Sequence, residues 1–450
     1  MIDLYPYQED GSSFLASKKH ALLADEMGLG KSCQAISACD QINAKRVLVL
    51  CPAVARLNWD REFTRFSQIE RESHVVMNSK GSIIGDLVIC SYDLASRKPI
   101  LDQLTREEID VLILDESHFL KNRQAKRTKI VYSKLLPLAK RVFCLSGTPA
   151  PNDPSELWTM LNAFGVYRKR YWDFVREYCT GFQDNFGFKI TGGKNIPHLK
   201  QAIQPIMLRR KKEEVLKDLP PIRYSEIVVE KSEVDEEIYF PETLAPNHVL
   251  DFKPMLDAVK LILDQTQGEQ TLQALHAIGG NKYNSGGVAK LRRFLGVSKA
   301  PGIAELIAND LQNGMRKIVV FAVHRDVIVL LRDALRKEFG RFGVVTLFGG
   351  TPPKRRQENI DRFQTNPKCR IFIGQVVAAG TAITLTAAHD VLFAEASWNP
   401  ADNAQAAMRC HRIGQDEPVF VRFVSAAGTI DERIQRVLRR KTETITRLFG

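Results

Sequence analysis

The stretch Leu22–Ser32, with the sequence LLADEMGLGKS, decides how this chain is interpreted. An apolar run leads into a Gly-x-Gly turn, and a segment of helical composition follows. Glycines let a backbone wrap around a phosphate with its N–H groups pointing inward, and the helix N-terminus adds a positive dipole. In such a loop Lys31 contacts the terminal phosphates and the Ser32 hydroxyl holds Mg²⁺. The full pattern has Gly where this chain has Asp25, so a plain strand-to-helix turn is the alternative.

Length and composition predict a globular protein of two or three domains. The chain has 450 residues, of which 44% are hydrophobic and 26% are charged. Its eight cysteines are scattered without a Cys-x-x-Cys pair, which predicts buried, reduced thiols and argues against a zinc site. No apolar stretch approaches the ~20 residues that cross a bilayer, and the first residues do not resemble a secretory signal. We therefore expect a cytoplasmic or nucleoid-associated protein without a membrane partner.

The charge balance favours a polyanionic partner. The 64 Lys and Arg residues against 52 Asp and Glu give a net charge of +12, and such an excess suits nucleic acid above all. A basic surface without a partner is the alternative, and charge alone does not exclude it. The sequence motifs therefore have to distinguish between these two alternatives.

Strand-like runs rich in Val, Ile, Leu and Phe recur between longer helical patterns. In the first half they are Val47–Cys51, His74–Met77, Leu87–Ser91, Val111–Leu114 and Val142–Leu145. In the second half they are Ile318–Phe321, Val344–Leu347, Ile371–Gly374, Val391–Ala394 and Val419–Val424. Near-continuous apolar strands separated by helices are typical of parallel sheets that are buried on both faces. The predicted fold class is α/β, with two doubly wound parallel-sheet lobes that carry helical insertions.

The predicted border between the lobes lies at Pro220 and Pro221, which end a predicted helix over Lys211–Leu219 and stiffen the exit from it. The first domain then covers residues 1–220, with an aromatic and basic insertion at about 165–205. The second covers residues 221–450, with a helical insertion at about 235–300.

The apolar run Val111–Leu114 leads directly into two acids, Asp115 and Glu116. Open α/β sheets bind their ligands at the carboxyl ends of strands. A carboxylate there can hold the Mg²⁺ of a bound nucleotide while its neighbour orients the attacking water. Helix capping is the alternative role for such an acid pair, and the preceding phosphate loop favours the catalytic one.

Two further motifs suit the same chemistry. Ser146 and Thr148, in the sequence LSGTP, follow an apolar strand, so their hydroxyls can bridge to the nucleotide site. A simple turn suits these residue types equally well. Arg409 and Arg412, in the sequence QAAMRCHRIGQ, are three residues apart and would share one face of a helix. Two guanidiniums on one face suit a γ-phosphate, and a solvated basic face is the alternative.

In their order and wording, these stretches resemble motifs I, II, III and VI of the Swi/Snf-type, remodeller-like ATPases of helicase superfamily two. In that family the first phosphate-loop position is commonly Asp, as Asp25 is here. The further matches are Tyr7-Gln8, Cys51–Phe63, Ile89–Asp93, Met207–Lys211, Asp218–Pro221, Ile318–His324, Gly349–Pro352, Ala378–Leu385 and Gly428–Arg433. The chain looks most similar to the annealing-helicase (HARP) subgroup. The features that indicate this subgroup are Asp115–His118, Val323–Val327 and the moderate size of the insertions. Motif V departs from the family, because Ala382 replaces its usual second glycine.

The resemblance implies two RecA-like lobes that bind ATP and Mg²⁺. The residues that it assigns to the nucleotide are Gln8, Asp25, Glu26, Met27, Gly28, Leu29, Gly30, Lys31, Ser32 and, in motif V, Gly380. Gln8 would contact the adenine edge and Lys31 the β- and γ-phosphates.

The resemblance also implies catalytic and coupling roles. Ser32 and Asp115 would hold Mg²⁺, and Glu116 would activate water. Arg409 and Arg412 would act as arginine fingers from the second lobe. The remaining assignments are Gln405 at the same γ-phosphate, and Ser146 and Thr148 in coupling hydrolysis to lobe movement.

DNA contacts are implied along motifs Ia, Ib and IV–V. The candidates are Arg56, Ser91, Tyr92, Lys121, Arg123 and His324, and ordinary surface positions are the alternative for them. The expected function is a monomeric, DNA-dependent ATPase that translocates on double-stranded DNA and remodels or anneals it without strong strand separation. One alternative is a strand-separating DNA or RNA helicase. A catalytically inactive nucleic-acid-binding scaffold is the alternative of another class.

Overall fold

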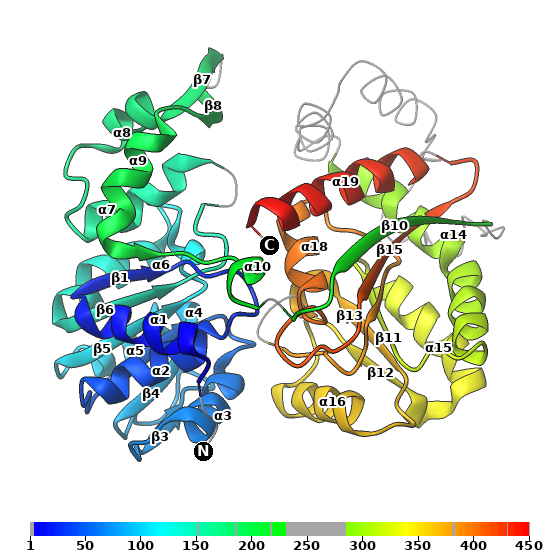
Figure 1. Ribbon diagram of the computed structural model, residues 1–450, viewed down its shortest axis with the longest axis horizontal. Coiled ribbons are helices and arrows are strands. Elements are labelled where there is room, and N and C mark those ends of the chain that lie inside the picture. The colour runs from blue at the N-terminus through cyan, green and yellow to red at the C-terminus, as the bar shows by residue number, and fades with distance from the viewer. Residues whose placement is uncertain are drawn as a thin grey trace. The chain divides into compact units, whose positions relative to one another are not determined.

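The structure is a computed structural model, which describes residues 4–150, 153–184, 187–216, 218–230, 285–379, 383–429 and 431–449 (Figure 1). The chain divides into two compact units, Met1–Asp218 with the last two residues, and Leu219–Leu448. Each unit is built on a parallel sheet of its own. Most of the predicted insertion at about 235–300 lies outside the described residues.

The first unit contains a seven-stranded parallel sheet with the order β3-β4-β2-β5-β6-β1-β9. Its strands are β1 (His20–Leu23), β2 (Val47–Cys51), β3 (Ser73–Val75), β4 (Leu87–Ser91), β5 (Ile109–Asp115), β6 (Ala139–Leu145) and β9 (Met207–Leu208). Every residue of β2 and β4 is buried, as their apolar composition predicts for strands covered on both faces. Because β5, β6 and β1 are consecutive in the sheet, their carboxyl ends meet at one edge.

Helices connect these strands. They are α1 (Pro6–Ser17), α2 (Lys31–Gln41), α3 (Arg56–Phe66), α4 (Tyr92–Ala95), α5 (Lys98–Leu104), α6 (Lys126–Ile130), α7 (Trp158–Ala163), α8 (Tyr171–Tyr178), α9 (Ile196–Ile203) and α10 (Lys212–Val215). An antiparallel hairpin of β7 (Cys179–Asp184) and β8 (Gly187–Gly193) projects at the opposite end of the unit from β3 (Figure 1). The predicted helix over Lys211–Leu219 is wrong in extent, since the backbone leaves the helical conformation at Leu216 and ends α10 there.

The second unit contains a six-stranded parallel sheet with the order β10-β15-β14-β11-β13-β12. Its strands are β10 (Ile222–Val229), β11 (Ile318–Ala322), β12 (Val344–Leu347), β13 (Ile371–Gln375), β14 (Asp390–Phe393) and β15 (Val419–Ala426). Its described helices are α14 (Ser285–Gln312), α15 (Arg325–Gly343), α16 (Pro353–Thr365), α17 (Val376–Ala379), α18 (Pro400–Ala407) and α19 (Asp431–Phe449).

Both faces of the second sheet are covered by apolar side chains. Along β11, Val319 and Phe321 belong to one core cluster, while Ile318 and Val320 belong to another. Since successive side chains of a strand point to opposite faces, the two clusters lie on opposite sides of the sheet. This arrangement confirms the predicted α/β fold of two doubly wound parallel sheets. Within the described residues, no helix is long and apolar enough to span a membrane.

The ten apolar runs singled out in the sequence all coincide with strands, three of them at both ends and the others with ends that differ by at most three residues. Two strands that the sequence analysis missed lie at sheet edges. β9 has only two residues, and β10 alternates half-buried and exposed positions such as Ile222 and Arg223. Neither therefore forms the continuous apolar run by which buried strands are found.

Candidate functional site

The predicted phosphate loop connects β1 to α2 and needs glycine at two positions. Gly28 has φ 93° and Gly30 has φ 74°, both in the left-handed region. A Cβ atom on Gly30 would lie 2.5 Å from Nε2 of Gln8, which is closer than side chains approach one another. α2 begins at Lys31, so its first backbone N–H groups lie at the end of the loop, where a helix offers donors to an anion.

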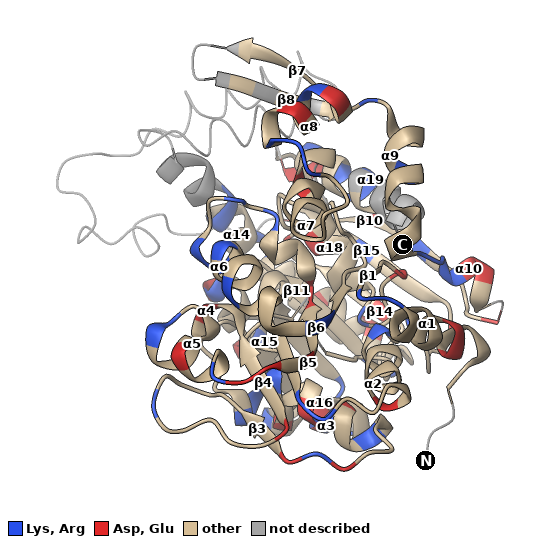
Figure 2. Cartoon of the chain, turned by 90° about the vertical axis from the view of Figure 1, so that its left-hand side faces the viewer, with Lys and Arg blue, Asp and Glu red and all other residues tan. Residues whose placement is uncertain are grey.

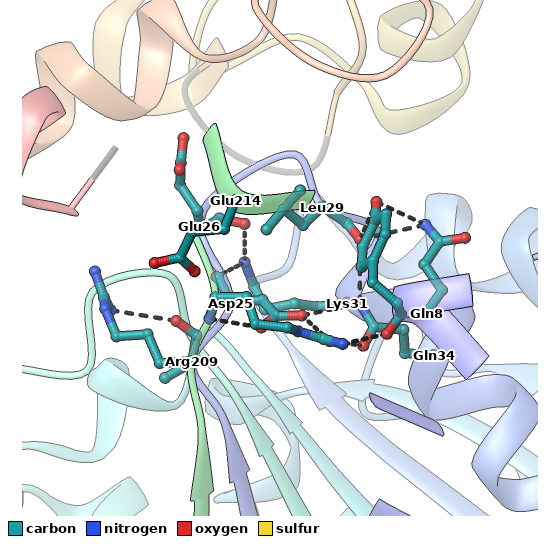
Figure 3. A network of polar contacts seen from close by, with 12 residues as sticks. Gln8, Asp25, Glu26, Leu29, Lys31, Gln34, Arg209 and Glu214 are labelled. Atoms are coloured by element: carbon teal, nitrogen blue, oxygen red, sulfur yellow. Dashed lines mark hydrogen bonds and ion pairs between the residues drawn. The ribbon is translucent and has the colours of Figure 1, made fainter. Parts of the chain in front are cut away.

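The Lys31 ammonium rests on the backbone of its own loop (Figure 3). Its Nζ donates to the carbonyl oxygens of Asp25 at 2.7 Å and Glu26 at 3.2 Å. A phosphate in the loop would give this ammonium a charged acceptor in place of neutral ones, and such hydrogen bonds are stronger. The Lys31 ammonium therefore already lies within the loop in which it is predicted to contact phosphates.

A distant segment that follows β9 holds the acidic part of the loop. Arg210 donates from Nε to Asp25 Oδ1 at 3.0 Å, and its Nη2 lies 2.5 Å from Asp25 Oδ2. Lys212 Nζ lies 3.2 Å from Glu26 Oε1, and its backbone N–H donates to Oε2 at 2.5 Å. Both carboxylates are buried, and buried charges need such partners. Asp25 and Glu26 thus shape the loop through Arg210 and Lys212.

Gln8, which the resemblance places at the adenine edge, is a buried residue of α1. Its Nε2 donates to the Leu29 carbonyl at 3.3 Å, and its Oε1 accepts the Tyr5 N–H at 3.0 Å. The Tyr7 hydroxyl donates to the same Leu29 carbonyl at 3.2 Å, and burial raises the pKa of Tyr7. Gln8 therefore contacts the phosphate loop itself, and its contact with adenine stays a prediction.

The predicted magnesium and water-activating acids lie at the end of β5. Asp115 Oδ2 accepts the Trp59 indole N–H at 2.8 Å, and Oδ1 accepts the Glu116 N–H at 3.0 Å. Burial, together with the charge of Glu116, raises the pKa of Asp115 to about 6, although the Trp59 hydrogen bond and the charge of Lys31 oppose the shift. Such a perturbed carboxyl group is typical of functional sites.

Helix capping does not explain Glu116. It precedes the short 3₁₀ helix Ser117–Leu120, but its side chain makes no capping hydrogen bond. Its backbone has φ 49°, which is uncommon for a residue other than glycine and occurs often at functional sites. The structure thus favours the catalytic interpretation of this acid over the capping one.

A polar chain connects the acid motif with the hydroxyl motif after β6. His118 Nδ1 lies 3.3 Å from Glu116 Oε2 and 3.2 Å from Ser146 Oγ. Ser146 is fully buried, and its Oγ also accepts the Thr148 N–H at 3.3 Å. The structure therefore brings the two motifs together, and their coupling role stays a prediction.

In the second unit, Gln405 lies in α18, and Arg409 and Arg412 follow this helix. The prediction that the two arginines share a helix face is wrong, because α18 ends at Ala407 and the backbone continues in turns. All three side chains are half-buried.

Hydrogen bonds hold this arginine motif in place. Arg412 Nη1 donates to the Ile383 carbonyl at 3.2 Å, and Gln415 Nε2 donates to the Ala388 carbonyl at 2.9 Å. Motif V and the segment that follows it therefore hold motif VI in its conformation. Gly380, assigned to the nucleotide by resemblance, lies outside the described residues.

Three of the six candidate DNA contacts are buried. Arg56 is 7% exposed and donates to backbone carbonyls, among them that of Val76. Tyr92 is 2% exposed, its hydroxyl donates to the Asp115 carbonyl at 2.7 Å, and burial raises its pKa. Ser91 is 3% exposed and caps α4. In this structure these side chains support the loops at the sheet edge, and their contact with DNA stays a prediction.

The other three candidates are accessible. Lys121 Nζ lies 2.7 Å from a carboxylate oxygen of Glu156, and the exposed Arg123 lies 4.6 Å from the centre of the Tyr171 ring. Basic side chains continue on α6, which Figure 2 shows in blue. His324, in the second unit, is half-buried, with its Nδ1 2.6 Å from Glu395 Oε1.

Several residues that were not assigned to the nucleotide site help to shape it. Trp59, Gln34 and Arg210 hold Asp115 or Asp25, and Arg209 bridges the carbonyls of Ala24 and Gly147 at 3.2 and 3.3 Å. Arg209 and Arg210 belong to the matched stretch Met207–Lys211, and Trp59 belongs to the matched stretch Cys51–Phe63. Gln34 lies outside every matched stretch, so no signal in the sequence pointed to it.

A predicted phosphate loop after β1, an acid pair at the end of β5 in the same parallel sheet and a second α/β unit with an arginine motif are the features expected of a helicase-like nucleotide-binding protein. The family models agree, since the SNF2-related domain matches residues 7–277 and the helicase conserved C-terminal domain matches residues 299–414. The first match covers more than half of the chain. The protein therefore belongs to the SNF2-related family of helicase-like ATPases, with two RecA-like lobes.

Several known proteins are similar to this chain. The SWI/SNF-related matrix-associated actin-dependent regulator of chromatin subfamily A-like protein 1 of Drosophila melanogaster is 32% identical, over 99% of this chain and 56% of its own length. The DNA annealing helicase and endonuclease ZRANB3 of Mus musculus is 32% identical, over 98% of this chain and 40% of its own length. The chain thus spans about half the length of these curated relatives. Among solved structures, the Sulfolobus solfataricus SWI2/SNF2 ATPase core in complex with dsDNA is 25% identical, with a TM-score of 0.44, and the match covers 99% of this chain and 95% of that one.

Proposed function

We propose that this chain is a DNA-dependent ATPase that couples ATP hydrolysis to translocation on double-stranded DNA, and that it remodels or anneals DNA without strong strand separation. The observation that carries the proposal is the placement of Lys31, Asp115 and Ser146 at the ends of three neighbouring strands, in a member of the SNF2-related family. The name of the Mus musculus relative, a DNA annealing helicase, supports DNA as the substrate.

The phosphate loop binds the triphosphate in this proposal. Backbone N–H groups of the loop Asp25–Ser32 and of the first turn of α2 bind the phosphates. The N–H of Glu26 is not among them, because it donates to the Arg210 carbonyl at 3.0 Å. Lys31 exchanges its two carbonyl acceptors for phosphate oxygens. Glu116, which His118 orients at 3.3 Å, positions the attacking water and accepts its proton.

The donors at this edge also fit magnesium. Mg²⁺ prefers hard oxygen ligands, and the Ser32 hydroxyl and the Asp115 carboxylate are such ligands. Burial raises the pKa of Asp115 to about 6, so a cation beside it would favour the ionised form. When bound with ATP, the metal neutralises charge on the phosphates.

The remaining assignments follow the family. Arg409 and Arg412 stabilise the charge that develops on the γ-phosphate, and Gln405 contacts the same group. For DNA, the accessible candidates Lys121, Arg123 and His324 are the ones that the structure leaves best placed for direct contact. We also retain residues 1–220 and 221–450 as the two domains of a monomeric motor.

Two other functions compete with this proposal. A strand-separating helicase uses the same ATP site, but the residue sequences of the motifs favour the remodeller-like ATPases. A catalytically inactive scaffold has no need to keep every catalytic side chain, and this chain keeps Lys31, Ser32, Asp115, Glu116, Arg409 and Arg412.

ATP turnover on a panel of nucleic acids tests the proposal. We expect duplex DNA to stimulate hydrolysis more than RNA, and a forked duplex to be unwound poorly. Turnover that no nucleic acid stimulates would contradict the translocase, whereas efficient unwinding of the fork would establish the helicase. Tight DNA binding with no ATP turnover would establish the scaffold.

A further inference from the structure

The second unit contains a basic groove far in sequence from the ATP motifs. It has a volume of about 560 Å³ and lies over the edge strand β12, between α15 and α16. Figure 1 shows these two helices beside β12. Six of its lining side chains are arginines, namely Arg325, Arg332, Arg336, Arg341, Arg355 and Arg362, against a single acid, Glu358.

The positive charge of this groove is largely uncompensated. Among the described residues, the ion pairs of the structure give only one of the six arginines a carboxylate, which is Asp333 at 2.7 Å from Arg332. Arg336 Nε is buried and has no hydrogen-bond partner among the described residues. Burial and the charges of Arg332, Arg341 and Arg355 lower the pKa of Arg336. Bringing these guanidiniums together is therefore unfavourable until an anion offsets their repulsion.

The groove also offers aromatic rings. Phe342 is 68% exposed, and the Arg362 guanidinium lies 5.9 Å from its centre. Phe348 lines the groove with Arg325 at 4.8 Å from its ring. Grooves that combine basic side chains with aromatic rings are typical of sites for single-stranded nucleic acid, whose phosphates pair with the cations while its bases stack on the rings.

A peptide that adds a strand to the sheet fits less well. The carbonyl oxygens of Val344 and Thr346 on β12 already accept hydrogen bonds from Arg336 Nη2 at 3.2 Å and Asn359 Nδ2 at 2.9 Å. These side chains cover the edge that strand addition would need. The guanidiniums of Arg341 and Arg355 and the exposed ring of Phe342 remain available to a nucleic acid.

We infer that this groove binds a single strand of nucleic acid, separately from the duplex on which the proposed motor moves. The inference rests on the proposed function in one respect, since a protein that anneals strands has to hold an unpaired one. Five of the six arginines of the groove lie outside the stretches that resemble the family motifs.

Fluorescence anisotropy with a labelled oligothymidylate tests the groove in the full chain. In Arg341→Ala/Arg355→Ala we expect about tenfold weaker binding, and a slope of log K against log salt that is less negative by about 1.4, because each lost contact to a single strand contributes about 0.7. The matched control is Lys337→Ala/Lys354→Ala, which removes the same charge from exposed positions of α15 and α16 that do not line the groove. It should bind like the wild type.

Three outcomes would overturn the inference. The first is oligothymidylate binding by both double variants at the wild-type affinity. The second is a loss of affinity that is equally large in both double variants. The third is weaker binding of poly-glutamate by the groove variant with unchanged oligothymidylate binding, because the groove would then be a site for acidic peptides. Duplex-stimulated ATP turnover, measured on the same preparations, separates this test from the proposed function. If duplex DNA does not stimulate ATP turnover by the wild-type protein, the proposed motor is contradicted. If stimulation is normal but the groove variant keeps the wild-type slope of log K against log salt, only the groove is contradicted.

Discussion

The charge state of Asp115 depends on the folded structure around it. Its carboxyl group is held at the end of β5 by Trp59, and burial with the adjacent Glu116 raises its pKa to about 6. An unfolded Asp titrates near 3.9, so the folded protein binds the extra proton between about pH 4 and pH 6. The stability that this proton contributes is complete below pH 4 and is lost as the pH rises through 6.

Asp115→Asn should therefore stabilise the nucleotide-free protein more at pH 8 than at pH 5, because the amide removes the buried charge and still accepts the Trp59 hydrogen bond. Two pKa units correspond to about 3 kcal/mol, and about half of this already applies at pH 5, so the difference between the two pH values is on the order of 1 kcal/mol. Urea unfolding at the two pH values measures it. A gain that is equal at both values would show that the Asp115 carboxyl is not protonated preferentially in the folded state.

Arg210 is the cation on which the shape of the phosphate loop depends. Its removal leaves Asp25 buried without a guanidinium, and breaking such a pair costs about 3–5 kcal/mol. We expect Arg210→Met to lower the free energy of unfolding by this amount and to weaken ATP binding. Adding Asp25→Asn should recover part of the stability, since no unpaired charge then remains. Lys211→Met, whose half-buried side chain pairs with the exposed Glu213 at 3.3 Å, is the control and should cost less than about 0.5 kcal/mol.

At the residue scale, sequence reasoning identified the chemistry of the loop but not its supports. The glycines, Lys31 and the acid pair follow from a pattern that phosphate binding imposes on neighbouring positions. Trp59 lies more than fifty residues from the carboxylate that it holds, and no local pattern encodes that contact. The DNA candidates Arg56 and Tyr92 were assigned by residue type, whereas their burial depends on how the loops pack.

Among the elements, α14, β15 and α19 of the second unit meet at a buried ion pair. Lys299 Nζ lies 2.6 Å from Asp431 Oδ2 and donates to the Val424 carbonyl at 2.8 Å, with both charged side chains almost fully enclosed. Lys299→Met would leave the carboxylate buried without its cation. We expect the free energy of unfolding of this unit to fall by about 3–5 kcal/mol, and urea denaturation measures this change.

Lys337→Met is the matched control for this change, because Lys337 is exposed on α15. It should leave the urea midpoint within the range of ordinary surface substitutions, about 0.5 kcal/mol. A midpoint for Lys299→Met that equals the control would show that Asp431 is satisfied without Lys299.

Element by element, the strands that form a continuous apolar run were predictable, the edge strand β12 among them, whereas the edge strands β9 and β10 were not. A central strand such as β2 must be apolar throughout, whereas β10 has one open side and carries Arg223 and Glu226. The end of α18 was also missed, since the sequence after Ala407 keeps helical composition while the backbone turns. Tertiary hydrogen bonds from Arg412 and Gln415 decide that conformation.

For the molecule as a whole, the order of motifs carries more information than any one of them. The phosphate loop alone left a simple turn open, and the acid pair alone left a helix cap open. Their strands prove to be close in the same sheet, with β6 between β5 and β1, so one edge collects both motifs. Family membership then follows from the match over residues 7–277.

Glu116→Gln provides the most direct measurement of the claim that this edge hydrolyses ATP. Single-turnover hydrolysis with duplex DNA present, together with binding of ATP, should be compared between this variant and the wild type. We expect nearly unchanged ATP binding and hydrolysis slowed by about 10²–10⁴-fold, because the amide keeps the shape of the side chain and cannot accept the proton of water. Hydrolysis by Glu116→Gln at the wild-type rate would contradict the assignment of the active site.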